Sequence, residues 1–185
     1  MRLIDDIICR LTREGGRIYD GEAVNQLEHA LQCAALARRE SAPDALVVAA
    51  LLHDYGHVLS DGGNTTGRRI APRHEDVAAR HLAAVFPAAV TEPIRLHVAA
   101  KRYLCTIDPD YRDALTPASR ASLKAQGGPF DEDGVHIFKR SRFWGDAVRL
   151  RQWDDMAKVA GLRTPGLATY RGAMVALAER VAAVA

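Results

Sequence analysis

Residues 49–60 read AALLHDYGHVLS and place His53, Asp54 and His57 at the end of an apolar run. Moving an imidazole or a carboxylate out of water is costly unless another group pairs with it. Residues at i and i+4 share one face of a helix, so His53 and His57 are expected to point into one cavity. The usual partners are a hydrogen-bonding network or a metal ion, and this motif alone leaves both interpretations open.

The composition is that of an ordinary globular protein. Of the 185 residues, 48% are hydrophobic and 26% charged, and the net charge of +2 does not favour nucleic acid or an anionic membrane as a partner. Cys9, Cys33 and Cys105 form no CxxC motif, which argues against structural zinc held by thiolates. We find neither a signal peptide nor a transmembrane run. We therefore expect one cytoplasmic domain over residues 1–185, and the oligomeric state stays open.

Hydrophobic periodicity predicts an all-α helical bundle. Apolar residues recur at helical spacing through most of the chain, and no alternating run indicates a sheet. Thr116-Pro117 is a typical helix start and Gly127-Gly128 a typical stop. Residues 127–141 are expected to form a short, turn-rich connection. The predicted helices cover residues 1–14, 22–40, 44–58, 73–86, 91–104, 116–125, 142–160 and 166–183.

Further ionisable residues stand within these predicted helices, and each has a simple structural interpretation when taken singly. His29 belongs to a polar stripe that could face solvent, and His74 could be a surface residue at a helix start. His97 could be a core histidine, and Asp154 could be half of an exposed ion pair. In chain order, however, these residues and the His53-Asp54 pair give the pattern H…HD…H…H…D.

This pattern resembles the HD-domain superfamily, whose members are all-α metalloproteins named for the His-Asp pair. Members with fewer histidines generally hold one metal, whereas the additional histidines resemble those of the binuclear subgroup. The resemblance implies a binuclear centre in which the Asp54 carboxylate bridges the two ions. Imidazole and carboxylate ligands suit iron or manganese, although these ligand types also permit zinc. The metal ligands implied are His29, His53, Asp54 and Asp154 for one ion, and His74 and His97, with Asp54, for the other.

Two cationic side chains stand one helical turn from predicted ligands. Lys101 follows His97 by four residues, and Arg151 precedes Asp154 by three. Residues so spaced lie on the same side of a helix, so both cations are expected beside the metals, where His57 could add a third donor. Converging donors of this kind suit a doubly charged phosphonate or phosphate.

Over residues 19–165 the chain more narrowly resembles the PhnZ- and TmpB-type phosphonate-cleaving oxygenases. The shared motifs are YxGExVxQLEHALQ, LLHDYGH, SxxSLxxQGGPF and RxWDDxAK. The resemblance implies a mixed-valent Fe(II)/Fe(III) pair that uses O2 to cleave the C–P bond of a 1-hydroxy-2-(trimethyl)aminoethylphosphonate-type substrate. The products would be phosphate and glycine or glycine betaine. Where Asn25 stands the family usually has serine, so free and trimethylated amines both stay open.

The same resemblance implies roles for residues outside the ligand set. Tyr19 would occupy an iron position until the substrate displaces it, and Glu22 would lie near the cationic amine. The residues expected to act in catalysis are Tyr19, Glu22, His57 and Lys101. The expected substrate-binding residues are Tyr19, Glu22, Asn25, His57, Lys101, Ser119, Ser122, Gln126 and Arg151.

Two other functions stay open from the sequence alone. An HD-type phosphohydrolase acting on a nucleotide or phosphomonoester would need a metal-activated water but no redox partner. A catalytically silent ligand-binding domain is the other, and the intact pattern of ligands speaks against it. A C–P bond offers no oxygen leaving group, so its cleavage is chemically sensible by an oxidative route. We therefore expect the oxygenase.

Overall fold

The computed structural model describes residues 2–16, 23–60 and 73–183. Every regular element within these residues is an α-helix, which confirms the predicted all-α fold. None of these helices is long and apolar enough to cross a membrane. The helices are α1 (Arg2–Glu14), α2 (Gln26–Arg39), α3 (Asp44–Leu52), α4 (Tyr55–Ser60), α5 (His74–Leu82), α6 (Ala88–Ile107), α7 (Pro109–Ala114), α8 (Pro117–Ala125), α9 (Glu132–Lys139), α10 (Trp144–Met156) and α11 (Ala168–Ala182).

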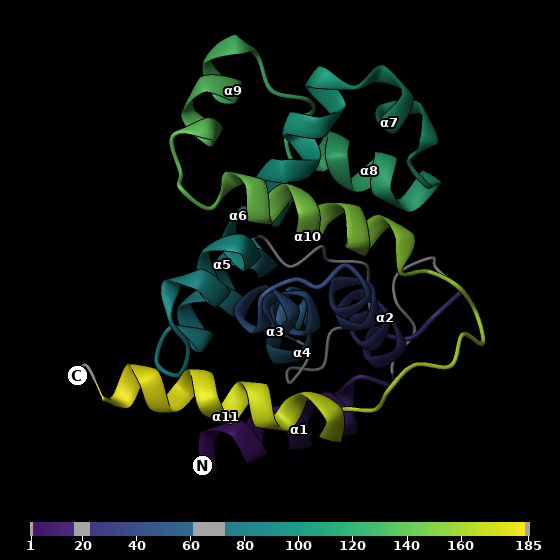
Figure 1. The fold of residues 1–185 in the computed structure, drawn as a ribbon. Coiled ribbons are helices and arrows are strands. Elements are labelled where there is room, and N and C mark those ends of the chain that lie inside the picture. The colour runs from purple at the N-terminus through teal and green to yellow at the C-terminus, as the bar shows by residue number, and fades with distance from the viewer. Residues whose placement is uncertain (1, 17–22, 61–72, 184–185) are drawn as a thin grey trace.

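The short helix α3 lies at the centre of the larger hydrophobic core. Its sequence, DALVVAALL, is apolar on every side, and all residues from Leu46 to Leu52 are buried. A helix without a polar face needs neighbours all round it. Helices α2, α6, α10 and α11 supply them (Figure 1). The apolar run that precedes the HDYGH motif therefore forms a central helix that these four helices surround.

The predicted helix over residues 44–58 is interrupted, so that prediction was wrong in this respect. His53 and Asp54 form a turn between α3 and α4. Helix α4 lies so close to α5 that a Cβ atom added to Gly56 would be only 2.0 Å from the backbone oxygen of His74. Glycine is required at this close approach. The turn allows the two side chains of the His-Asp pair to face different helices.

Helices α7, α8 and α9 form a second layer across α6 and α10 (Figure 1). Asp108, Thr116 and Asp131 cap these helices by accepting a hydrogen bond from a backbone N–H three residues further on. The expectation that residues 127–141 form only a turn-rich connection was wrong, because α9 lies within them. The Asp131 cap and the burial of Phe138 stabilise a helix too short for its periodicity to stand out.

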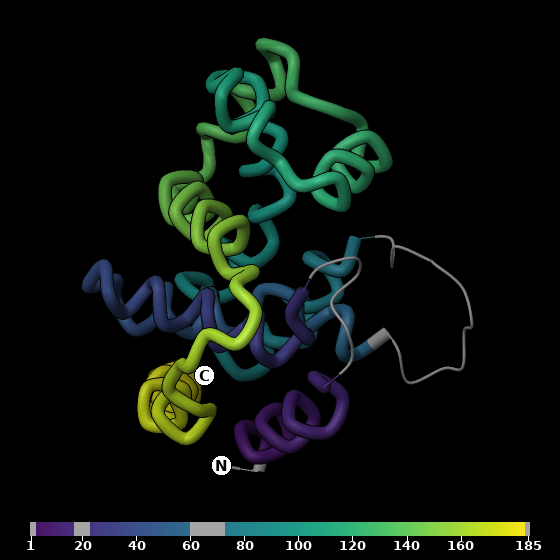
Figure 2. The backbone as a smooth tube through the Cα atoms, turned by 90° about the vertical axis from the view of Figure 1, so that its right-hand side faces the viewer, coloured from purple at the N-terminus to yellow at the C-terminus, as the bar shows by residue number. Residues whose placement is uncertain are grey.

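Helices α1 and α11 pack against each other at the opposite end of the molecule from α7–α9 (Figure 2). Arg171 of α11 donates a hydrogen bond to Asp5 of α1 at 2.9 Å. Apolar side chains from both helices, including Ile7 and Met174, are buried in the same core as α3. The two terminal helices therefore close the side of the core that faces away from the second layer.

Candidate metal centre

All six predicted metal ligands are buried, and they meet between α2, α5, α6, α10 and the turn that joins α3 to α4. Helix α2 carries the first histidine, α5 begins with another, and α6 and α10 carry the last two ligands. The structure thus brings together side chains that are up to 125 residues apart in the chain. They are His29, His53, Asp54, His74, His97 and Asp154.

One group of donors consists of His29, His53, Asp54 and Asp154. The Nε2 atoms of His29 and His53 are 3.2 Å apart, and His29 Nε2 lies 3.4 Å from Asp154 Oδ1. Asp54 Oδ2 lies 3.4 Å from His53 Nε2. Ligand atoms bound about 2.1 Å from one ion lie about 3 Å apart when they are at right angles. The spacing of this group therefore fits a single metal ion.

A second group consists of His74, His97 and the other oxygen of Asp54. The two Nε2 atoms are 3.1 Å apart, and Asp54 Oδ1 lies 3.2 Å from His74 Nε2 and 3.8 Å from His97 Nε2. These three side chains are also a possible metal-ligand set by their mutual distances. Asp54 presents Oδ2 to the first group and Oδ1 to the second, as a bridging carboxylate would.

The outer ring nitrogens of three of these histidines are fixed by main-chain hydrogen bonds. Nδ1 of His29, His53 and His97 lies 2.9, 2.9 and 2.7 Å from the backbone oxygens of Ala157, Ala50 and Ile94, respectively. A carbonyl oxygen only accepts, so Nδ1 carries a proton, and in the neutral imidazole Nε2 presents a lone pair. Two lone pairs that face each other repel unless a cation lies between them. This arrangement favours a metal site over a simple hydrogen-bonding network.

Two carboxylate oxygens at the centre of the cluster lack a hydrogen-bond partner among the described residues. They are Asp54 Oδ2 and Asp154 Oδ1, and both are buried. Burial alone would raise the pKa of each carboxyl, but His53 holds the pKa of Asp54 well below its usual range, and Arg151 does the same for Asp154. Both groups are therefore ionised. A bound cation would give these two buried anionic oxygens the direct partner that they lack among the described residues.

The imidazoles respond to the same surroundings. Burial lowers the pKa of His53 and lowers that of His97 well below its usual value. Burial also acts to lower the pKa of His74, but its hydrogen bond to Asp54 outweighs this effect and raises the pKa. A metal ion competes with protons for these nitrogens, so metal binding to the cluster will release protons.

Sequence reasoning missed Cys33, which lies one turn after His29 on α2. Its buried Sγ is 3.7 Å from His29 Nε2, and with His29 and His53 it forms another possible ligand set. Burial raises the pKa of the thiol, which disfavours the thiolate form that binds metals. The spacing of four residues from His29 is the sequence signal that could have indicated this position.

His57 is half-buried at the edge of the second group. Its ring stacks on that of His74 with the centroids 4.1 Å apart, and its Nε2 lies 4.0 Å from Asp54 Oδ1. It therefore lies beside the cluster, although it belongs to α4 rather than to a continuation of α3. Among the other predicted substrate residues, Tyr19 and Glu22 lie outside the described residues. Asn25 caps α2 through reciprocal hydrogen bonds with Glu28.

Lys101 and the predicted serines form a polar region between α6 and α8. The buried Lys101 donates from Nζ to Ser122 Oγ at 2.7 Å, and Ser122 donates to the carbonyl oxygen of Ser119 at 3.0 Å. Burial and the nearby Arg151 lower the pKa of Lys101 to about 8. Gln126 follows at the end of α8, and its buried Oε1 has no hydrogen-bond partner within the part of the chain that the structure describes.

The guanidinium group of Arg151 is bound to two carboxylates. Its Nη1 lies 2.8 Å from Asp154 Oδ2, its Nε donates to Asp155 Oδ2 at 2.9 Å, and its Nη2 donates to Asp155 Oδ1. The Tyr111 hydroxyl also donates to Asp155. This network holds Oδ2 of Asp154 and leaves Oδ1 facing His29, so Arg151 orients a predicted ligand. A direct contact between Arg151 and the substrate stays a prediction.

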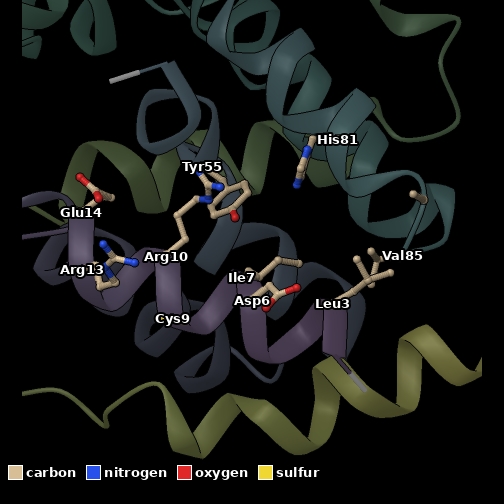
Figure 3. A pocket seen from close by; sticks show the side chains of 11 residues that line it. Leu3, Asp6, Ile7, Cys9, Arg10, Arg13, Glu14, Tyr55, His81 and Val85 are labelled. Carbon is tan, nitrogen blue, oxygen red and sulfur yellow. The ribbon is translucent and has the colours of Figure 1, made fainter. Parts of the chain in front are cut away.

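A separate cavity of about 640 Å³ lies between α1, α4 and α5. Figure 3 shows its polar lining, to which Arg10, Arg13, Tyr55 and His81 contribute. Among the residues that the structure describes, no predicted metal ligand or substrate-binding residue lines this cavity. The candidate site is therefore defined by the converging donor atoms described above and not by this hollow.

Comparison with known proteins gives relatives over most of the chain. The family model "HD domain" matches residues 26–110. The chain is 46% identical over 165 residues to hydroxymethylphosphonate dioxygenase of Gimesia maris, with 88% of this chain and 82% of that protein covered. It is 40% identical over 154 residues to the glycine-betaine-forming [1-hydroxy-2-(trimethylamino)ethyl]phosphonate dioxygenase of Leisingera caerulea, with 83% and 79% covered. It is also 31% identical over 175 residues to uncharacterized protein L432 of Acanthamoeba polyphaga mimivirus, with 93% and 80% covered. The chain therefore belongs to the HD-domain family, and it is a metal-binding enzyme of the oxygenase class.

Proposed function

We propose that the protein is a di-iron oxygenase that uses O2 to cleave the C–P bond of a 1-hydroxyphosphonate. A 1-hydroxy-2-(trimethyl)aminoethylphosphonate-type substrate would give phosphate and glycine or glycine betaine. Hydroxymethylphosphonate would give phosphate and formate by the same stoichiometry. In each reaction one oxygen atom of O2 ends in the carboxylate and the other in phosphate. The names of two relatives, which act on substrates of these two kinds, support the proposal.

The observation that carries the proposal is the pair of donor groups that share Asp54. Each group has two histidine Nε2 atoms that lie close together, and each contains one oxygen of the same buried carboxylate. Imidazole and carboxylate donors suit iron. When bound, a mixed-valent Fe(II)/Fe(III) pair would supply the redox chemistry that O2 requires.

The residues beside the cluster would bind and orient the substrate. Lys101 would bind the phosphonate through its ammonium group, with Ser119 and Ser122 as neighbouring donors. His57, which lies next to the second donor group, would contact the same end of the substrate. We further propose that Tyr19 covers the metal site before the substrate binds, and that Glu22 faces the amine.

The chemistry of the bond favours oxidation over hydrolysis. A phosphomonoester has an oxygen leaving group, so a metal-activated water suffices to cleave it. The carbon of a phosphonate is a poor leaving group, and oxidation of that carbon to a carboxylate allows phosphorus to leave as phosphate. An HD-type phosphohydrolase remains the alternative that the experiment must distinguish.

The decisive experiment measures O2 consumption and phosphate release on one enzyme sample of known iron content. The substrates are hydroxymethylphosphonate, 1-hydroxy-2-aminoethylphosphonate, its trimethylated form and a phosphomonoester. We expect two irons per chain, equal amounts of O2 consumed and phosphate released with at least one hydroxyphosphonate, and no turnover without O2. Phosphate release from the phosphomonoester under argon, with none from the phosphonates in air, would establish the hydrolase instead.

A further inference from the structure

A chain of hydrogen bonds that begins on the second layer reaches the predicted metal ligand Asp154. The Tyr111 hydroxyl of α7 donates to Asp155 Oδ2 at 2.5 Å. Arg151 Nε donates to the same carboxylate oxygen at 2.9 Å and also lies 3.2 Å from the Tyr111 hydroxyl oxygen, which accepts from it. Arg151 Nη1 in turn lies 2.8 Å from Asp154 Oδ2. The network therefore runs without a break from α7 to a ligand on α10.

The planar guanidinium group explains how this network sets the direction of Asp154. Nε and Nη2 of Arg151 both donate to the Asp155 carboxylate, and this paired contact fixes the plane of the guanidinium group. Nη1 is the remaining nitrogen, and it contacts Asp154 Oδ2. The other oxygen of Asp154 lies 3.4 Å from His29 Nε2, within the first donor group. The position of Asp155 thus influences where a ligand oxygen of the metal centre lies.

Tyr111 holds Asp155 from outside its own helix. The terminal torsion of an aspartate has a broad preference, so the carboxylate needs contacts to keep one orientation. Arg151 and Lys158, which contact Asp155 Oδ1, stand four residues before it and three residues after it in the chain. Tyr111 comes instead from α7, and its ring packs against both smaller hydrophobic clusters, which include Phe138 and Leu123. Its hydroxyl is therefore held in place by packing that does not involve α10 alone.

We propose that Tyr111 is a positioning residue of the metal centre, which acts through Asp155 and Arg151 on the ligand Asp154. This inference requires only that the donor groups bind a metal ion, so it goes beyond the proposed oxygenase reaction and does not depend on it. Helix α8, which carries the predicted substrate serines, follows α7 directly. The same tyrosine therefore ties the substrate side of the second layer to the metal side.

The test measures the apparent affinity of each variant for Fe(II) by equilibrium competition with the chelator bipyridine under argon. The variants are Tyr111→Phe, which keeps the ring and removes the hydroxyl, Asp155→Asn, and the double variant that combines them. Tyr103→Phe is the matched control. Tyr103 is a buried tyrosine of the neighbouring cluster, and its ring centroid lies 5.1 Å from that of Phe138.

The expected effects follow the order of the contacts in the network. Tyr111→Phe should weaken Fe(II) binding by roughly 3- to 10-fold, which is the size of a typical hydrogen-bond contribution. Asp155→Asn should weaken it by roughly 10- to 100-fold, as loss of a group that orients a ligand typically does. In the Asp155→Asn background, the further change of Tyr111 should alter the affinity by less than about twofold, because the hydroxyl acts through that carboxylate. The control should also stay within about twofold of the unmodified enzyme.

An Fe(II) affinity of Tyr111→Phe within about twofold of the unmodified enzyme would overturn the proposal. An equal loss of affinity on adding Tyr111→Phe to the unmodified enzyme and to Asp155→Asn would overturn it as well, because the two residues would then act independently. The circular dichroism spectrum verifies the fold, and Tyr111→Leu or Asp155→Ala replaces a variant that does not fold. The measurement uses neither O2 nor a phosphonate, so its failure is distinguishable from a failure of the proposed oxygenase reaction.

Discussion

The metal centre and the cationic subsite, which we define as Lys101, Ser119 and Ser122, lie side by side but are built differently. Three imidazoles of the metal centre are anchored by hydrogen bonds from Nδ1 to main-chain carbonyl groups. His53 and His97 donate to the residue three positions earlier in the chain, and His29 donates to Ala157 at the end of α10. The cationic subsite instead contains the long side chain of Lys101, which donates to the Ser122 hydroxyl group. A main-chain anchor leaves an imidazole little freedom, whereas a lysine can follow the position of its anion.

This difference indicates how the site divides its tasks. Under the proposed function, the rigid short ligands would fix the position of the metal ions, and the flexible Lys101 would accommodate the substrate. Arg151 belongs with the first region, because it joins Asp154 to Asp155 and Tyr111. Substitutions in the first region should therefore change metal content, and those in the second should change substrate affinity without changing metal content.

The largest expected effect follows from Asp54→Ala. This substitution removes the carboxylate whose two oxygens face both donor groups, so both metal ions should be lost together. We expect activity to fall by at least about a thousandfold, because the redox centre would be absent. Metal analysis of the purified variant checks this directly. Retention of two irons per chain would show that Asp54 does not bridge them.

Lys101→Met should separate the two regions most clearly. The change removes a buried ammonium group but keeps most of the apolar packing of its side chain. We expect KM for the hydroxyphosphonate to rise roughly 10- to 100-fold, with two irons per chain still bound. Steady-state kinetics and iron content on the same preparation provide the measurement. Loss of iron in this variant would place Lys101 with the metal centre instead.

Arg151→Met should give the opposite pattern, in which iron binding weakens while substrate affinity changes little. Without the guanidinium group, Asp154 loses the partner that holds its Oδ2 and keeps its pKa low. Loss of such an orienting group typically weakens metal binding by about 10- to 100-fold. Iron retention against a competing chelator measures this effect. If iron were retained normally while phosphate affinity fell, Arg151 would contact the substrate directly.

The pH dependence of kcat/KM should sharpen the description of the cationic subsite. The pKa of Lys101 is lowered to about 8 by burial and by Arg151, while Asp154, Asp155 and Cys105 act in the opposite direction. Binding of an anion needs the protonated amine, so kcat/KM should fall by up to about tenfold per unit as pH rises above 8. Lys101→Arg should flatten this limb, because arginine stays charged. If kcat/KM of Lys101→Arg fell above pH 8 as it does in the unmodified enzyme, the titration of another group would cause the fall.

The smallest effect is expected from Thr116→Ala. Thr116 caps α8 by accepting from the backbone N–H of Ser119, so its loss should lower the free energy of unfolding by about 1 kcal/mol. Loosening of α8 should also raise KM severalfold while iron content stays constant. Asp131→Ala, which removes the cap of α9, is the matched control for stability. Equal increases of KM in both variants would show that α8 has no special role.

Much of the fold could be predicted from the sequence because helical periodicity is a local property. The apolar run of α3 and the cap at Thr116 both indicated helices that the structure contains. The turn at His53 and Asp54 could not be predicted, because it depends on the close contact of Gly56 with α5. Helix α9 was missed because the burial of Phe138 against side chains of α6 and α10 stabilises it.

The sequence by itself determined the helical class, the membership of the family and the six residues with donor atoms, since these depend on residue types and their spacing. A shared Asp54 was already implied by the family resemblance, but only the tertiary structure decided which of its oxygens faces each donor group. The tertiary structure also decided that Arg151 is bound to two carboxylates. It also placed Lys101 within hydrogen-bonding distance of Ser122. The physical reason is that the direction of a side chain depends on the packing of helices that are distant in the chain, which local spacing does not specify.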